Sequence, residues 1–193
     1  MKNIIVAAAV LAAAPAFAAT STFTGAMSGG LAGAGFGFGA NSLTTGAASI
    51  SINTSTSMLS YSYSWAGLTS NASSAGLQCC SAINQATGPL AVVFSDFVGG
   101  SMTGSFSGMV DLTQASAYDA GFLAANGGTA AGAYTALLAG LNSSKGYGMV
   151  YSTFANGQPA VRGLVAAVPE PGTYALLALG LGLVALRARK QTS

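Results

Sequence analysis

The clearest pattern in this chain is the alternation of large apolar residues with serines between Leu59 and Trp65. This two-residue period is typical of an antiparallel strand with one buried face. Leu59, Tyr61, Tyr63 and Trp65 are therefore expected to point into a core. The same aromatic row has a second interpretation, a stacking platform for carbohydrate, and core packing is the preferred one.

Weaker strand patterns flank this segment on both sides. Together they give seven predicted strands, at residues 20–25, 47–52, 58–65, 90–97, 101–112, 147–154 and 160–166. The second and third are expected to pair through a turn at residues 53–57, and the last two through Asn156-Gly157-Gln158-Pro159.

Between the fifth and sixth predicted strands the period changes to that of a helix. Thr113 is the expected N-cap of a short first helix, with Asp119 on its solvent side. Thr129 is the expected cap of a second helix, whose apolar face repeats at i, i+3, i+4 and i+7 through Tyr134, Leu137, Leu138 and Leu141. The predicted fold class is mainly β, a Greek-key-like two-sheet antiparallel sandwich with a short helical insertion.

The N-terminus has the pattern of a secretory signal peptide. Lys2 precedes an apolar stretch, and the small residues Ala16 and Ala18 suit a signal peptidase. We expect cleavage after Ala18, so residues 1–18 are a processing segment and residues 19–167 form one domain.

The C-terminus, residues 168–193, combines an acidic motif, an apolar run and a basic end. Val168-Pro169-Glu170-Pro171 precedes an uncharged run over residues 172–186, and Arg187, Arg189 and Lys190 follow it. A helix of this length spans roughly 22 Å, against about 30 Å for a bilayer core. We expect an apolar C-terminal helix that spans the inner membrane marginally, with its basic end in the cytoplasm.

The domain between these ends carries very little charge. Its only carboxylates and cationic side chains are those of Asp96, Asp111, Asp119, Lys145 and Arg162. With no basic patch, nucleic acid is not expected as a partner. The chain has no histidine, which excludes His-dependent nucleophile systems and His-ligated metals. No catalytic residue, metal or cofactor is therefore predicted, and the protein is not expected to be an enzyme.

Cys79 and Cys80 are adjacent and are the only cysteines. An intramolecular disulfide could join only these two neighbours, and an oxidising exported setting favours it. Two free thiols or an intermolecular bridge are the alternatives. The vicinal disulfide is the preferred interpretation.

The C-terminal segment resembles the PEP-CTERM sorting signal of exported bacterial proteins, on Val168-Pro169-Glu170-Pro171, the apolar run and the basic end. The resemblance implies processing by an exosortase, a membrane transpeptidase-like protease, in a Gram-negative host that usually makes extracellular polysaccharide. It also implies that the inner membrane holds the chain only transiently, before release to the cell surface or the extracellular matrix.

The domain resembles the CHRD domain, a module of microbial exported proteins. The matching stretches are Phe23-Thr24-Gly25, residues 59–68, Gly104-Ser105-Phe106-Ser107-Gly108, residues 137–141, Val161-Arg162-Gly163 and the Cys79-Cys80 pair. The departures are as important as the matches. Members of the family usually carry His-Ile-His before the cysteine pair, Asn-Ile-His-Thr in a late strand, and a Glu before the closing Ile-Arg-Gly. Here these positions are Gly76-Leu77-Gln78, Met149-Val150-Tyr151-Ser152 and Ala160, whereas Arg162 is retained.

These observations favour a non-catalytic structural or adhesive protein at the cell surface or in the matrix. The alternative is a module that binds glycan or another surface protein through exposed aromatic residues. Its candidate ligand contacts are Tyr147, Tyr151 and Arg162, although packing of Arg162 on a sheet face is preferred to a ligand role.

Overall fold

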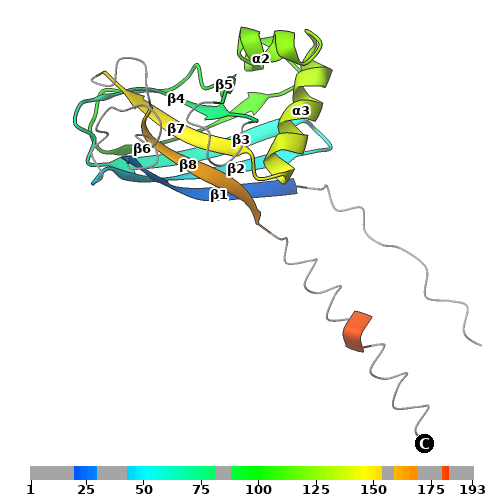
Figure 1. Cartoon of the computed structure of the whole chain (residues 1–193), viewed down its shortest axis with the longest axis horizontal. Helices are drawn as coiled ribbons and strands as arrows, with labels where there is room; N and C mark the ends of the chain where they lie inside the picture. The colour runs from blue at the N-terminus through cyan, green and yellow to red at the C-terminus, as the bar shows by residue number, and fades with distance from the viewer. Residues whose placement is uncertain (1–19, 30–42, 81–87, 154–158, 169–179, 183–193) are drawn as a thin grey trace, which may run out of the picture.

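Eight β-strands form a single antiparallel sheet in the structure, a computed structural model that describes residues 20–29, 43–80, 88–153, 159–168 and 180–182 (Figure 1). The strands are β1 Thr20–Ser28, β2 Thr45–Asn53, β3 Met58–Ala66, β4 Ala72–Gln78, β5 Leu90–Val93, β6 Gly104–Asp111, β7 Gly146–Ser152 and β8 Pro159–Val168. Their order across the sheet is β5-β4-β7-β8-β1-β2-β3-β6. A 3₁₀ turn, η1 Ala115–Ala117, and two helices, α2 Ala120–Ala125 and α3 Ala130–Asn142, lie between β6 and β7.

The predicted two-sheet sandwich is not confirmed, because β8 joins what would have been two sheets. It pairs with β7 on one side and with β1 on the other. The junction between β1 and β8 carries a glycine on each strand. A Cβ on Gly25 would overlap the Leu164 carbonyl, and a Cβ on Gly163 would overlap the Ala26 carbonyl. The missing side chains let the two strands approach closely enough for one sheet to curl into a half-barrel.

The core lies inside this curl. Leu59, Tyr61, Tyr63 and Trp65 of β3 are 0%, 3%, 1% and 3% exposed. The prediction that they point into the core is confirmed, and the interpretation of this row as a carbohydrate platform is wrong.

The two halves of the curled sheet face each other across that core. The Tyr63 hydroxyl of β3 donates to the Gly76 carbonyl of β4 over 3.2 Å. A Cβ on Gly148 of β7 would meet Ala48 of β2 and the ring of Tyr63. Helix α3 packs against β7 and β8 and lies across one end of the sheet, next to α2 (Figure 1). Its buried side chains Leu137 and Leu141 join the core cluster.

The segment between β5 and β6, the two edge strands, covers the open side of the curl. Phe94 stacks on Tyr61 with ring centroids 3.8 Å apart, and Phe97 packs edge-on against Phe106 of β6 at 5.0 Å. Asp96 of this segment accepts a hydrogen bond of 2.6 Å from the Tyr61 hydroxyl. Aromatic side chains therefore hold the edges together where no strand pairing joins them.

The helical insertion differs from its prediction at one cap. Asp119, expected on the solvent side of the first helix, is its N-cap and accepts from the backbone amides of Gly121 and Phe122. Thr113, the expected cap, instead donates to Asp111 in the turn after β6. Capping of the second helix by Thr129 is confirmed, since its side chain accepts from the Gly132 amide.

The two predicted processing segments fall mostly outside the described residues. The signal peptide at residues 1–18 lies outside them, and so does the predicted membrane helix at residues 172–186, apart from residues 180–182, which are helical. Within the described part of the chain, no helix is long and apolar enough to span a membrane.

Candidate functional site

The three candidate ligand contacts lie together on the outer face of β7 and β8. Arg162 of β8 is opposite Met149 of β7 in the register, and antiparallel partners share a face of the sheet. The guanidinium carbon of Arg162 lies 3.8 Å from the centroid of the Tyr147 ring. Tyr151, on the same face, directs its hydroxyl toward the Met149 sulfur at 2.8 Å.

This cluster is buried, contrary to the prediction of exposed aromatics. Tyr147 and Arg162 are 5% and 3% exposed, and Tyr151 is half-buried. Burial lowers the pKa of the Arg162 guanidinium, whereas Tyr147 and Tyr151 oppose that shift. Burial also raises the pKa of the Tyr151 phenol. A hydrogen bond from Gln78 and the positive charge of Arg162 lower the same pKa and offset part of this rise. A desolvated cation over an aromatic face contributes about 2 kcal/mol, so packing is a sufficient role for Arg162.

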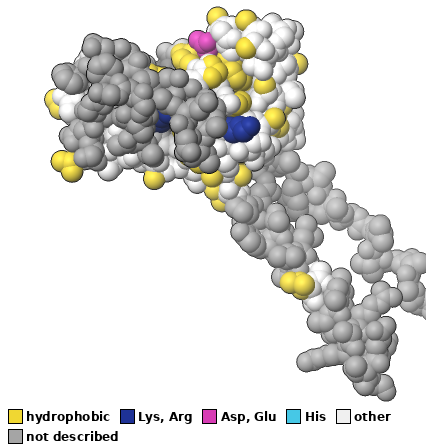
Figure 2. Space-filling model, viewed as in Figure 1, with side chains coloured by type: hydrophobic (Ala, Val, Ile, Leu, Met, Phe, Trp, Pro, Cys, Tyr) yellow, Lys and Arg dark blue, Asp and Glu magenta, His cyan; other side chains and the backbone are white. Residues whose placement is uncertain are grey.

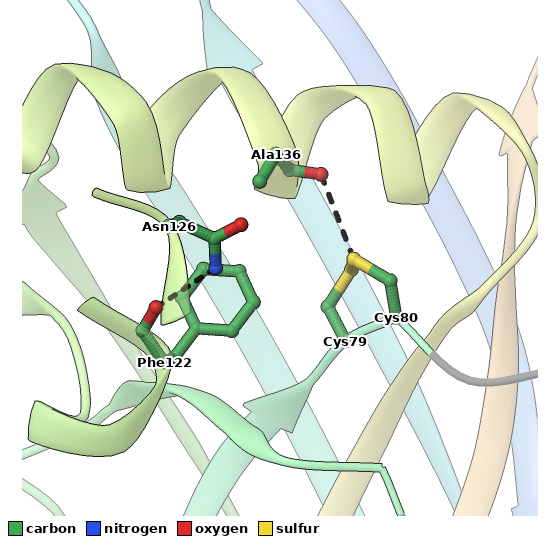
Figure 3. The surroundings of a disulfide bond; sticks show 5 residues. All are labelled: Cys79, Cys80, Phe122, Asn126 and Ala136. Atoms are coloured by element: carbon green, nitrogen blue, oxygen red, sulfur yellow. Dashed lines mark hydrogen bonds between the residues drawn. A yellow bond between two sulfur atoms is a disulfide. The ribbon is translucent and has the colours of Figure 1, made fainter. Parts of the chain in front are cut away.

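The disulfide candidate lies at the end of β4, under helix α3. Cys79 and Cys80 are joined by a disulfide in the structure. Figure 3 shows the bond facing α3, where the Cys80 sulfur is 3.5 Å from the Ala136 carbonyl oxygen. A disulfide sulfur carries no proton, so this is a packing contact, and only a reduced Cys80 could donate there. The helix accommodates the sulfurs at Gly140, where a Cβ would overlap both of them.

Each carboxylate of the domain has a structural partner. Asp96 accepts from Tyr61, and Asp119 caps α2. Asp111 accepts from the amide and the hydroxyl of Thr113, and these bonds lower its pKa. Among the described residues no group of three His, Cys, Asp or Glu side chains could hold a metal ion.

A second surface was not singled out by the sequence prediction. Hydroxyl side chains are the commonest outward side chains of β1, β2, β3 and β6, and we call this group of residues the hydroxyl face. Its members are Thr22, Thr24, Ser49, Ser51, Ser60, Ser62, Ser64, Ser105 and Ser107, all exposed or half-buried. The same side of the sheet also carries Ala26, Ala47 and the exposed Met109, which is opposite Ser60. A shallow trough of about 550 Å³ crosses it, lined by Thr24, Gly25, Ala26, Ala47, Ala48, Ser49, Ser62 and Ser64.

Comparison with known protein families finds a match at the C-terminal end of the chain. Residues 167–191 match the PEP-CTERM protein-sorting motif. The match begins at the last two residues of β8, where Val168 pairs with Thr22 of β1. Neither a curated protein nor a solved structure matches the chain. The motif indicates export in a Gram-negative bacterium and processing by an exosortase.

Proposed function

We propose that this protein is a non-catalytic structural or adhesive domain, which its C-terminal signal delivers to the cell surface or the extracellular matrix. The observation that carries the proposal is the sorting motif at residues 167–191. The chain would be held briefly in the inner membrane, cut by signal peptidase after Ala18 and by an exosortase near Pro169-Glu170-Pro171, and then released outward.

A non-catalytic role is supported by how the domain uses its few reactive groups. Its three aspartates bind a tyrosine hydroxyl, a turn and a helix N-terminus, and none of the three is paired with another carboxylate. The two cysteine sulfurs are bonded to each other. Arg162 is buried over Tyr147. The domain would therefore act through its surface and its location.

We also propose that the domain is a divergent relative of the CHRD domain. The positions at which that family carries histidines correspond here to Gly76, Gln78 and Tyr151. Gln78 pairs with Tyr147, Gly76 pairs with Met149, and Met149 pairs with Arg162, so these five residues share one face of β4, β7 and β8. Positions that are far apart in the sequence thus lie side by side in the sheet. This is the arrangement expected if the family's histidines form one polar site and if packed side chains occupy that site here.

Sorting is tested by deleting residues 169–190 from a chain that carries an epitope between Gly127 and Gly128, an exposed turn suited to an insertion. We expect loss of the epitope from the surface and matrix fractions. The matched control deletes Thr192 and Ser193, which lie beyond the matched motif, and should leave the distribution unchanged. An unaltered distribution after the long deletion would contradict the sorting proposal.

A further inference from the structure

The sorting motif begins inside the folded domain. Its matched residues start at Ala167, and Ala167 and Val168 are the last two residues of β8, where they pair with Phe23 and Thr22 of β1. Pro169 follows directly, and a proline has no backbone N–H with which the ladder could continue. The segment that an exosortase has to recognise therefore shares two residues with the β-sheet.

The surroundings of β8 change after Val165. Up to that residue β8 lies between two strands, since Val165 pairs with Gly146, the first residue of β7. The last three residues, Ala166–Val168, which we call the end of β8, pair among the described strands with β1 alone. Val165 is fully buried, whereas Val168 is 44% exposed. The end of β8 is therefore held from one side and buries little apolar surface.

The ladder that holds this end is short. Its three pairs join residues 166–168 to residues 22–24, and the next pair along the two strands, both of which are described over their whole length, is Arg162 with Ser28. The interval between these pairs contains the close approach at Gly25 and Gly163. Because the ladder is interrupted there, the three outer pairs can open while the inner part of β8 stays in the sheet.

Charge does not strengthen this end of the sheet. Neither β1 nor residues 163–168 contain a charged side chain, and charged side chains are sparse over the described surface that is visible in Figure 2. Three backbone pairs and the contacts of small side chains therefore hold the end of β8. Segments with few buried apolar contacts and exposed backbone hydrogen bonds are the ones that open locally.

Cleavage of the motif requires such an opening. A peptide bound in extended form pairs its backbone N–H and C=O groups with its receptor, as an added strand does at a sheet edge. The backbone groups that pair with β1 are not available for this purpose. We propose that an exosortase acts on this chain only after residues 166–168 leave β1. The proposal rests on the processing proposed above and names β1 as the element that controls its rate.

A reversible cross-link between β1 and the end of β8 tests the proposal. Thr22→Cys/Val168→Cys joins two antiparallel partners, whose Cα atoms lie about 4.5 or 5.5 Å apart, within the range of about 4.4–6.8 Å that a disulfide needs. The full chain, in mild detergent, is incubated with membranes of a Gram-negative bacterium that processes PEP-CTERM proteins, and mass spectrometry follows loss of the C-terminal segment. We expect the oxidised variant to be cut at least roughly tenfold more slowly than the same variant after reduction, because cleavage follows the population of the open form.

The comparison is made within one variant because residue 168 belongs to the matched motif. The matched control is Thr45→Cys/Ala66→Cys, which links paired ends of β2 and β3 and should be cut at the same rate in both redox states. Peptide mapping verifies each new cross-link and the native Cys79–Cys80 bond. Equal cutting of oxidised and reduced Thr22→Cys/Val168→Cys overturns the proposal, as does an equal slowing of the oxidised control.

Hydrogen exchange of the unaltered full chain measures the opening without an exosortase. We expect the amides of residues 166–168 that pair with β1 to exchange at least roughly tenfold faster than those of Val161 and Val165, which are fully buried. One common exchange rate would show that the end of β8 opens only with the whole domain, and would overturn the proposal. Rapid exchange without any cut by the membranes would support the opening and reject the processing proposed above.

Discussion

Gly140 offers the sharpest test of how the vicinal disulfide packs against α3. This residue is buried in the helix, and a Cβ at its position would overlap the sulfurs of Cys79 and Cys80. Helix propensity alone favours Gly140→Ala by about 0.8–1 kcal/mol. Overpacking a filled site costs about 1–3 kcal/mol, so we expect a net destabilisation of about 1 kcal/mol.

The sign of the effect should reverse when the sulfurs are removed. In a Cys79→Ala/Cys80→Ala background the two overlapping sulfurs are absent, and the tightest remaining contact of the new methyl group is the Cβ of residue 80, at 3.0 Å. Gly140→Ala should then stabilise the protein by up to about 1 kcal/mol, the helix-propensity term alone. The difference between the two backgrounds is a coupling free energy of about 2 kcal/mol, which a double-mutant cycle isolates.

Urea unfolding provides the free energies of this cycle. Trp65 is the only tryptophan and is 3% exposed, so its fluorescence reports loss of the core. The control is Ala139→Gly, at the neighbouring exposed position of α3, which should cost about 1 kcal/mol in both backgrounds. Equal effects of Gly140→Ala with and without the sulfurs would refute the packing described here.

Three further predictions concern the core and its ionisable groups. Tyr61→Phe removes the hydrogen bond to Asp96 and should lower the free energy of unfolding by about 1–2 kcal/mol in urea melts, an effect that should be largely lost in an Asp96→Ala background. Arg162→Lys replaces the planar group over Tyr147 and should cost about 1–2 kcal/mol, whereas Lys145→Arg at the surface should be neutral. Burial raises the pKa of several tyrosines, so their folded state holds the proton more tightly than the unfolded chain. Stability should therefore be flat from about pH 5 to 9, because the chain has no histidine, and should fall as pH rises above about 10, the tyrosine pKa of the unfolded chain. Thermal melts across this range check the profile, and a loss of stability between pH 6 and 7 would contradict it.

Local patterns predicted most of the strands. All seven predicted strands overlap observed ones, and the serine alternation in β3 identified its buried side correctly. The prediction of β5 continued to Phe97, whereas the strand ends at Val93. Tertiary packing causes the difference, because Phe94 and Phe97 leave the ladder to cover Tyr61 and Phe106.

The missed strand, β4, has no local signal. Its sequence Ala-Ser-Ser-Ala-Gly-Leu-Gln contains no β-branched or aromatic residue and no alternation. It is a strand because β5 and β7 supply backbone partners on both sides. The sequence of such a segment does not show which distant strands it pairs with. For the same reason, the sequence could not predict that Gln78 lies opposite Tyr147.

The candidate site, too, was predicted from the sequence only in part. Tyr147, Tyr151 and Arg162 were chosen together from sequence, and the structure places them together. Their burial could not be predicted, because a tyrosine within a strand carries no sign of what covers its face. The hydroxyl face was visible only as serines on the solvent side of single strands. Strand register turned those serines into one surface.

The sequence by itself determined that this protein carries an export and sorting signal and which side of β3 is buried. A sorting motif is read as a linear segment, and strand amphipathicity is set by neighbouring residues along the chain. Only the tertiary structure decided that eight strands form one curled sheet, that Arg162 is buried, and that scattered serines form a continuous face. These features depend on which strands exchange hydrogen bonds, and β8 lies between β7 and β1 through contacts that no local pattern specifies.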